Sequence, residues 1–311
     1  MTQIVVGCPY TEMSGLTKSI TKFSSELEII NVSDIVFISY NNLIVAGATN
    51  PISISNIRSA FIRYPYDLIP PHSESFELRE KTEFLKTVSL MLKHCAINPV
   101  ERSWQIRNRL YSLSIAKEKG INVPTSQIVA NGMEIFELSD RVFVKAMGNC
   151  FVSEKETDLN PQLLKFLHRE EDDGDIAWIF HAQKFNVDSF AKYVESVGYG
   201  FCQNIIKNLK EYRVYIIENE LFVYCRDEIE QEDKSKAAYN KVKEPLDNDY
   251  IKLLKDFAKD LGLDYLCMDV IENEKGYFLI DINPFGSLPP YPELPEPTDA
   301  LAKLMIKKAK L

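Results

Sequence analysis

Short apolar runs alternate with amphipathic segments along the first part of the chain. The runs over residues 3–8 and 27–32 have the length of buried strands, and the segment 14–26 between them has helical spacing. Further apolar runs fill residues 33–47. This βαβ pattern with an added hairpin predicts a small open α/β domain, which we place at residues 1–97.

The end of this first region predicts one more strand and a long helix. Residues 57–67 read as a strand that ends in a loop, and Arg63 stands just past its apolar part. Residues 73–95 have the pattern of an amphipathic helix, for which Ser73 or Ser75 is a suitable N-cap.

The remaining two thirds of the chain predict a second α/β region. We expect helices over 107–120 and 247–263, where Gly120 and Gly262 suit the positions that end a helix, and a last helix from 298. The segment 187–197 is compatible with a helix or an extended linker. The expected strands are at 140–145, 175–186, 201–228 with a polar turn, and 265–283 as a hairpin; 168–175 is expected to be a solvated turn.

Composition and charge narrow the function. The chain has 311 residues, of which 45% are hydrophobic, and a formal net charge of -9, which argues against a broad basic surface for nucleic acid. The 6 cysteines are scattered without a C-x-x-C pair, so neither a zinc cluster nor a disulfide framework is indicated. No run reaches the roughly 18 apolar residues of a membrane helix, and we expect a cytoplasmic protein.

Polar residues interrupt the apolar hairpin at its second half. Asp281 and Asn283 are two residues apart and project from the same side of a strand, while Ile280 and Ile282 would face the other side. Asp269 on the adjoining strand could share the polar face. Two carboxylates and an amide oxygen in a small volume suit Mg²⁺. The alternative is that Asp281 caps a turn and Asn283 merely precedes a proline.

Two basic residues are embedded in other predicted strands. Lys145 follows "VFV", where a buried lysine requires an anionic partner such as a nucleotide phosphate, unless it reaches solvent at a strand edge. Arg213 lies in "EYRVYII" and could bind a carboxylate or phosphate through two donors. Its alternative partner is Glu211, on the same face of the strand.

The order of these features resembles the ATP-grasp ligases. The resemblance covers about residues 98 to 290 and rests mainly on "RNRLYSLSIAKEKGINVPTSQIV" and "LCMDVIENEKGYFLIDINPFGS". Within that superfamily, the chain is similar to the branch of the ligases that add glutamate to a ribosomal protein and of the graspetide (microviridin-type) peptide-macrocyclising ligases. The stretches "FIRYPY", "ELREKTEFLKTVSLMLKH" and "CQNIIKNLKEYRVYIIENELFV" favour the graspetide side.

The resemblance implies an α/β ATP-grasp fold in which the domain at 1–97 precedes a central lobe at 98–200 and a C-terminal lobe at 201–311. It implies ATP between the two lobes and Mg²⁺ as the metal. The implied site residues are Lys145 at the α- and β-phosphates; Gln203, Asn204 and Ile205 along the adenine; Asp269, Asp281 and Asn283 at Mg²⁺; and Arg213, Arg226 and Arg63 at the reacting or substrate carboxylates.

Two departures from the resembled pattern stand out. Arg109 occupies the position where we expect the family's first ATP-binding lysine, and arginine keeps the charge without the point-donor geometry. The glycine-rich loop after Lys145 is reduced to Gly148, within a segment, 146–160, that we expect to form a flexible lid.

Three functions remain open at this stage. The first is a peptide-modifying ligase, a homodimer, that grips the leader helix of a precursor peptide through residues 73–95 and the strand pair 212–224. It would join side-chain carboxylates to Ser/Thr hydroxyls or Lys amines. The second is a carboxylate–amine ligase that acts on small amino acids or a protein C-terminus. The third is a nucleotide-binding scaffold without activity, suggested by Arg109 and the reduced glycine loop.

Overall fold

The chain was analysed as a computed structural model. The structure describes residues 3–7, 13–63, 76–130, 140–145, 151–153, 161–172, 175–180, 182–207, 210–226, 239–241 and 246–311. The proposed N-caps Ser73 and Ser75, Gly148 and most of the predicted lid lie outside these residues.

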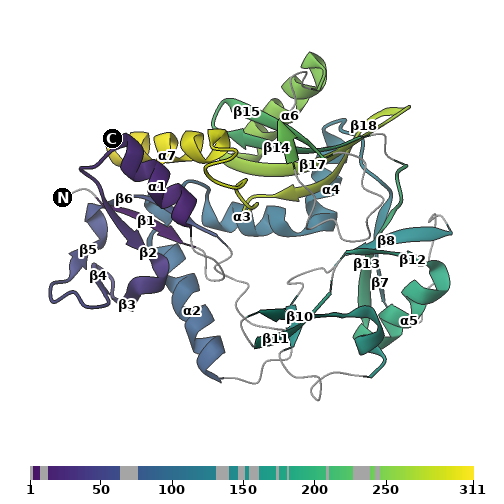
Figure 1. Ribbon diagram of the computed structural model, residues 1–311, viewed down its shortest axis with the longest axis horizontal. Helices are drawn as coiled ribbons and strands as arrows, with labels where there is room; N and C mark the ends of the chain where they lie inside the picture. Colours follow the sequence, from purple (N-terminus) through teal and green to yellow (C-terminus); the bar gives the residue numbers. More distant parts are fainter. Residues whose placement is uncertain are drawn as a thin grey trace.

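The N-terminal region forms the predicted α/β unit (Figure 1). Its parallel sheet has the order β2-β1-β6, with β1 (Gln3–Gly7) between β2 (Glu28–Asn31) and β6 (Ile57–Ile62). The helices of this unit are α1 (Ser14–Phe23) and α2 (Phe76–Met91). The added antiparallel sheet is formed by β3 (Ile35–Ile38), β4 (Asn42–Val45) and β5 (Ile52–Ser53). The strands and the hairpin predicted from the sequence are therefore confirmed.

The middle of the chain carries a second, antiparallel sheet, at the right of Figure 1. Helices α3 (Val100–Arg107) and α4 (Arg109–Glu118) lead into it, and Gly120 follows with φ +81° as predicted. The sheet order is β12-β8-β13-β7, and α5 (Val187–Val197) packs against it, so this segment is a helix and not a linker. Its strands are β7 (Ser126–Ala130), β8 (Arg141–Lys145), β12 (Gln183–Asn186) and β13 (Tyr199–Asn204).

A separate three-stranded sheet corrects two expectations. Its strands are β9 (Phe151–Ser153), β10 (His168–Asp172) and β11 (Asp175–Ile179). The acidic segment 168–175, expected to be a turn, is mostly strand, because its backbone pairs with β11 in an antiparallel ladder. The single strand expected over 175–186 is two strands, β11 and β12, in different sheets.

The C-terminal lobe is a five-stranded antiparallel sheet with the order β16-β15-β14-β17-β18. The predicted hairpins and helices are present, and Gly262 ends α6 in the left-handed conformation at φ +66°. The last helix begins slightly before the predicted position. The elements are β14 (Lys210–Ile217), β15 (Glu220–Arg226), β16 (Tyr239–Lys241), α6 (Asn248–Leu261), β17 (Tyr265–Asn273), β18 (Gly276–Asn283) and α7 (Glu296–Ala309). Short 3-10 turns occur at η1 (Val32–Asp34), η2 (Ile54–Asn56), η3 (Lys93–Cys95) and η5 (Leu163–Phe166).

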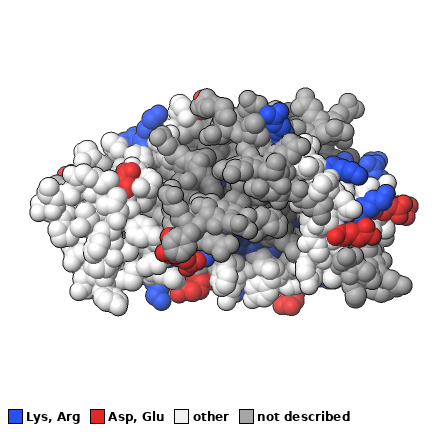
Figure 2. Space-filling view, turned by 90° about the horizontal axis from the view of Figure 1, so that it is seen from below, with Lys and Arg blue, Asp and Glu red and all other residues white. Residues whose placement is uncertain are grey.

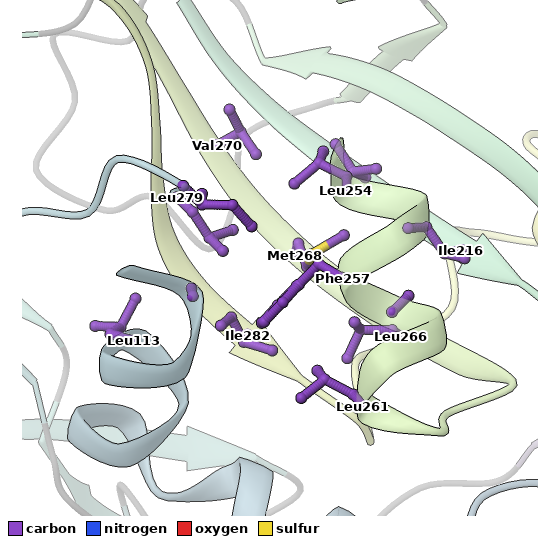
Figure 3. Close-up of a cluster of buried hydrophobic side chains, with 14 of the residues drawn as sticks. Leu113, Ile216, Leu254, Phe257, Leu261, Leu266, Met268, Val270, Leu279 and Ile282 are labelled. Atoms are coloured by element: carbon purple, nitrogen blue, oxygen red, sulfur yellow. The ribbon is translucent and has the colours of Figure 1, made fainter. Parts of the chain in front are cut away.

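Each face of this sheet has its own hydrophobic core. On one face, Met268, Val270, Leu279 and Ile282 pack against α4 and α6 (Figure 3). On the other face, Tyr215, Tyr265 and Cys267 pack against α7, α1 and β1. Helix α7 lies beside α1 (Figure 1), so the N-terminal unit and the C-terminal sheet share one core. Further along the same strands, this face carries Arg213, Asp269 and Asp281, where Lys145 of β8 and Gln203 of β13 approach β18.

Charged side chains of both signs are distributed over the described surface seen in Figure 2, without a large patch of one sign. No helix of the described residues is long and apolar enough to cross a membrane.

Candidate active site

A row of charged residues crosses three neighbouring strands of the C-terminal sheet. The strand register places Arg213 of β14 opposite Asp269 of β17, and Asp269 opposite Asp281 of β18. Directly opposed residues of antiparallel strands project to the same face, with Cβ atoms about 4.5–5.5 Å apart. The hairpin predicted from the sequence therefore brings the two aspartates together.

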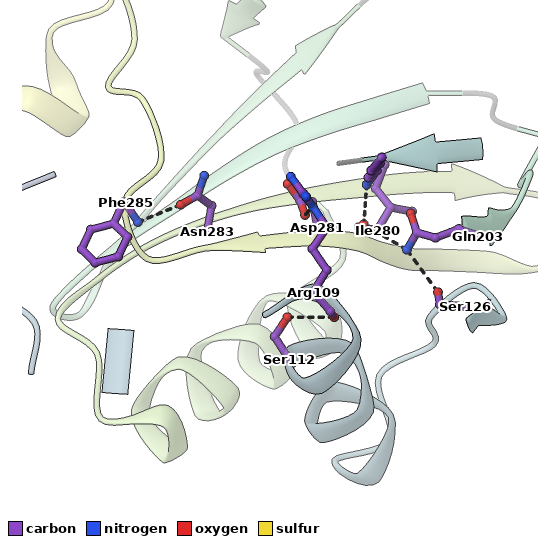
Figure 4. Close-up of polar contacts among 9 residues, drawn as sticks. Arg109, Ser112, Ser126, Gln203, Ile280, Asp281, Asn283 and Phe285 are labelled. Carbon is purple, nitrogen blue, oxygen red and sulfur yellow. Dashed lines mark hydrogen bonds and ion pairs between the residues drawn. The ribbon is translucent and has the colours of Figure 1, made fainter. Parts of the chain in front are cut away.

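Each of the two carboxylates has a guanidinium partner. The Nε atom of Arg213 lies 2.7 Å from Oδ1 of Asp269, and both side chains are mostly buried. Arg109, the first residue of α4, donates from Nε to Oδ1 of Asp281 at 3.3 Å (Figure 4). Two like charges on neighbouring strands are thus stabilised by one cation each.

A β-bulge lies beside the carboxylate pair. Val270 pairs with Leu279 and Asp269 with Asp281, which leaves Ile280 as the extra residue of β18. The Ile280 carbonyl accepts a hydrogen bond from Nζ of Lys145 at 2.9 Å and one from Nε2 of Gln203 at 3.5 Å (Figure 4). The bulge also corrects the predicted alternation: Leu279 and Ile282 enter the core, whereas Ile280 is only half-buried.

Lys145 and Gln203 connect the central sheet to this bulge. Both side chains are buried, with 7% of Lys145 and 2% of Gln203 exposed. The Lys145 ammonium therefore does not extend into solvent, which removes the strand-edge alternative. Because it approaches Asp281 closely enough to lower that group's pKa, it adds a third cation to the charged row.

The electrostatics of the two aspartates differ. Burial raises the pKa of Asp269 above its ordinary value; Arg213 opposes this shift and the Asp281 charge adds to it. Burial acts in the same direction on Asp281, but Lys145, Arg109 and Arg213 outweigh it and hold the pKa of Asp281 below its ordinary value. Neighbouring carboxyl groups whose pKa values are driven apart by specific partners are typical of functional sites.

Asn283 ends β18 in a defined orientation. Its Oδ1 accepts the backbone N–H of Phe285 at 2.8 Å (Figure 4). Because an N–H donates to this atom, it is the amide oxygen and not the amide nitrogen. An amide oxygen has two lone pairs and can accept from more than one donor or cation.

The donor set of these three residues fits Mg²⁺. Within the described parts of the chain, no three His, Cys, Asp or Glu side chains form a metal-binding cluster. Two carboxylates and one amide oxygen match a Mg²⁺ ion that completes its octahedron with water and phosphate oxygens. The three cations around the pair, Lys145, Arg109 and Arg213, suit the phosphate groups that such an ion accompanies.

The other predicted site residues lie at the ends of β13, β15 and β6. The backbone N–H of Asn204, at the end of β13, donates to the Thr125 carbonyl at 2.8 Å, and Ile205 follows in the connection to β14, half-buried. Arg226 pairs through its backbone with Glu211 and Tyr239. Arg63 is buried just past the end of β6 and donates to Phe285 O and Ser287 Oγ in the loop after Asn283.

Sequence reasoning missed several residues around the site. Cys267 lies opposite Asn283 and its sulfur accepts from Nη1 of Arg213 at 3.3 Å; burial raises the pKa of this thiol to about 11, so it is neutral. Glu211, which the sequence had already placed on the same face as Arg213, is buried and adds to the negative charge near Asp269. Alternation along β17 could have placed Cys267 on this face.

Comparison with known proteins identifies the fold. No family model matches the chain, and no curated protein sequence matches it. Among solved structures, the macrocyclase MdnC from Microcystis aeruginosa MRC, bound with the precursor peptide MdnA, is similar at a TM-score of 0.71 and 14% identity. The alignment covers 98% of this chain and 99% of that one.

Two further structures give the same result. The Chryseobacterium gregarium RiPP-associated ATP-grasp ligase, in complex with ADP and a leader and core peptide, has a TM-score of 0.69 at 15% identity, over 99% of this chain and 97% of that chain. The D-alanine–D-alanine ligase of Bacillus anthracis, complexed with ATP, has a TM-score of 0.59 at 12% identity, over 100% and 98%. The chain therefore has the ATP-grasp fold, which confirms the fold predicted from the sequence.

Proposed function

We propose that the chain is an ATP-dependent ligase that joins side-chain carboxylates of a precursor peptide to Ser/Thr hydroxyls or Lys amines of the same peptide. The observation that carries the proposal is the row Arg213–Asp269–Asp281 with Arg109 and Lys145 around it, at the junction of the two lobes. The full-length similarity in fold to ligases solved with precursor, leader and core peptides supports a peptide as the substrate.

The chain's residues fit ATP and Mg²⁺ at this junction. Asp269, Asp281 and Asn283 would hold Mg²⁺, which when bound neutralises charge on the phosphate oxygens. Lys145 and Arg109 would bind phosphates. Gln203, Asn204 and Ile205, at the end of β13, would lie along the adenine.

Arg213 would bind the reacting carboxylate. Asp269 holds the guanidinium as an ion pair, and the mostly buried pair is oriented before a substrate arrives. A carboxylate is a poor electrophile; transfer of the γ-phosphoryl group to it gives an acyl phosphate and ADP. Attack by a hydroxyl or amine then forms the ester or amide and releases phosphate and a proton. Positioning and charge neutralisation supply most of the acceleration of such phosphoryl transfers.

The peptide would be held at two places. A leader helix bound by the 73–95 region and the β14–β15 hairpin would supply affinity, while the core segment reaches Arg213 and Arg226. We further propose that the enzyme is a homodimer that works in the cytoplasm.

Mass spectrometry tests this function. The purified protein is incubated with ATP, Mg²⁺ and a candidate precursor peptide; each bond made removes one water from the peptide. Alkaline hydrolysis of the product then separates esters, which reopen, from amides, which do not. Arg213→Ala is expected to stop the loss of water, and Arg58→Gln, at an exposed arginine of β6, serves as the matched control.

Two other outcomes would contradict the proposal. ADP release with free amino acids and none with any peptide would identify a small-molecule ligase, for which the fold of the D-alanine–D-alanine ligase is a precedent. ATP binding without ADP release under all conditions would identify an inactive scaffold.

A further inference from the structure

The loop that follows Asn283 is held by hydrogen bonds to every backbone carbonyl from Pro284 to Ser287. Nδ2 of Asn98 donates to Pro284 O at 3.2 Å, and Nε of Arg63 donates to Phe285 O at 2.8 Å. The Tyr265 hydroxyl donates to Gly286 O at 2.6 Å, and the Tyr215 hydroxyl to Ser287 O at 2.8 Å. Arg63 adds a second bond from Nη2 to the Ser287 hydroxyl at 3.1 Å.

All four donors belong to buried residues, and the bonds to Pro284 O, Phe285 O and Gly286 O are themselves buried. The exposed fractions are 8% for Arg63, 8% for Asn98, 0% for Tyr265 and 3% for Tyr215. Asn98 is itself fixed, because it donates to Tyr265 O at 2.7 Å and accepts Tyr265 N–H at 2.9 Å. Hydrogen bonds in such surroundings are strong, and losing one partner leaves a buried polar group unpaired.

Packing alone does not fix the loop on its inner side. Pro284 and Phe285 line a small apolar cavity of about 30 Å³ between β6, α2 and α3. A void removes the neighbours that would resist movement. On the opposite side, Gly286 lies against Cys267, where an added Cβ would come within 2.2 Å of the Cys267 Cβ. The hydrogen bonds therefore determine where the loop sits relative to Cys267 and the charged row.

We infer that Arg63 is a positioning residue for the metal ligand Asn283, and that the N-terminal unit thereby sets the geometry of the metal site. The connection is short: Arg63 holds Phe285 O, and Phe285 N–H holds the Oδ1 of Asn283 that would face the ion. Outer residues that orient metal ligands typically contribute 10–100-fold to metal affinity or activity. The inference deepens the proposed function and rests on Asn283 being a ligand.

Metal binding tests the inference separately from ligation. The affinity for Mn²⁺, which can replace Mg²⁺ at oxygen ligands, is measured by electron paramagnetic resonance with a fixed excess of ADP. Arg63→Gln is expected to weaken Mn²⁺ binding by about 10-fold and to lower kcat, with the KM for the peptide unchanged. Arg63→Lys, which keeps a charged donor, should restore part of the affinity. The control Arg58→Gln, on the same strand but exposed, should bind Mn²⁺ as the parent protein does.

Tyr265→Phe covers the case in which Arg63→Gln does not fold. It keeps the buried ring and removes the hydroxyl that donates to Gly286 O, so we expect a folded protein whose Mn²⁺ affinity falls in the same direction by a smaller factor.

The outcomes separate the alternatives. A raised peptide KM with unchanged Mn²⁺ affinity in Arg63→Gln would show that Arg63 touches the substrate and would overturn the inference, as would unchanged Mn²⁺ affinity in both variants. A parent protein that binds no Mn²⁺ with ADP would overturn it too. If Mn²⁺ binding responds as expected but no peptide is ligated, the inference holds and the proposed function fails.

Discussion

Asp281 is the residue at which the charges of the site converge, since Arg109, Lys145 and Arg213 all act on it. Asp281→Asn removes one charge without changing shape, so the fold should persist while ATP turnover falls by more than about 100-fold. ADP release measures turnover and circular dichroism checks the fold. Asp256→Asn, at an exposed aspartate of α6, is the control; turnover retained in Asp281→Asn would contradict the metal assignment.

Lys145 has two roles that one variant separates. In the structure its ammonium binds Ile280 O, and in the proposed complex it would bind phosphate. Lys145→Met should weaken ATP binding by a charge-assisted hydrogen bond, about 1.5–3 kcal/mol, or roughly 10- to 100-fold. Calorimetry gives the affinity, with the exposed Lys184→Met of β12 as control. Unchanged ATP affinity would assign Lys145 to holding the bulge.

At the scale of single residues, the sequence was sufficient to identify the site residues whose charge is unusual in an apolar strand. Lys145, Asp269 and Asp281 are charged residues inside apolar strands, and the conflict itself marks them. Three residues that donate hydrogen bonds to the loop carbonyls, Asn98, Tyr215 and Tyr265, could not be identified in this way. A tyrosine in a strand and an asparagine after a helix are both ordinary. Their role depends on which distant backbone atoms they meet, which one sequence does not contain.

At the scale of elements, the hairpin β17–β18 shows where pattern reasoning stops. Period-two alternation and the turn at 274–275 predict two antiparallel strands and the facing of Asp269 toward Asp281, and the register confirms both. The bulge at Ile280 was missed, since a bulge is a property of the pairing and not of either strand alone. It is this bulge that releases the carbonyl to which Lys145 and Gln203 bind.

The loop after β18 requires glycine at position 286. An added Cβ would lie 2.2 Å from Cys267 Cβ and 2.8 Å from its sulfur. Gly286→Ala should therefore destabilise the protein by about 1–3 kcal/mol through overpacking, measured as the free energy of unfolding in urea. The exchange variant, Gly286→Ala with Cys267→Gly, returns the space. Its free energy of unfolding should be higher than the sum of the two single changes predicts; strict additivity would rule out the clash.

At the scale of the molecule, the two ends of the chain share one hydrophobic core. Helix α7 follows the site in sequence and packs against α1 and β1 of the N-terminal unit, so the last helix completes the first domain's core. The boundaries predicted at 97 and 200 remain predictions, and the joint core was not foreseeable, because the apolar stripe of α7 would suit any partner of similar shape. The ATP-grasp fold was predicted through the resemblance of the chain to the ATP-grasp ligases, and the similarity to solved structures confirms it.

The junction of α7 with α1 gives the molecule a pH-dependent contribution to stability. Asp299 of α7 accepts from the buried Ser19 hydroxyl and pairs with Lys22 at 2.8 Å. Burial opposes ionisation of Asp299, but Lys22 and Ser19 outweigh it and hold its pKa below the ordinary value. A carboxyl whose folded-state pKa is depressed stabilises the fold above its unfolded pKa, roughly 3.9, and loses that contribution as the pH falls through the folded-state pKa.

Asp299→Asn should therefore lower the free energy of unfolding by about 1–3 kcal/mol at pH 7, and the difference from the parent should shrink as the pH falls below about 4. Urea denaturation at a series of pH values measures both curves. Asp256→Asn is the matched control, because Asp256 is exposed on α6 and the variant makes the same change of charge there. A constant difference between Asp299→Asn and the parent across the acid range would mean that the side chain acts through shape and not charge. The packing of α7 on α1 would then depend on shape and hydrogen bonding at this junction and not on the ion pair with Lys22.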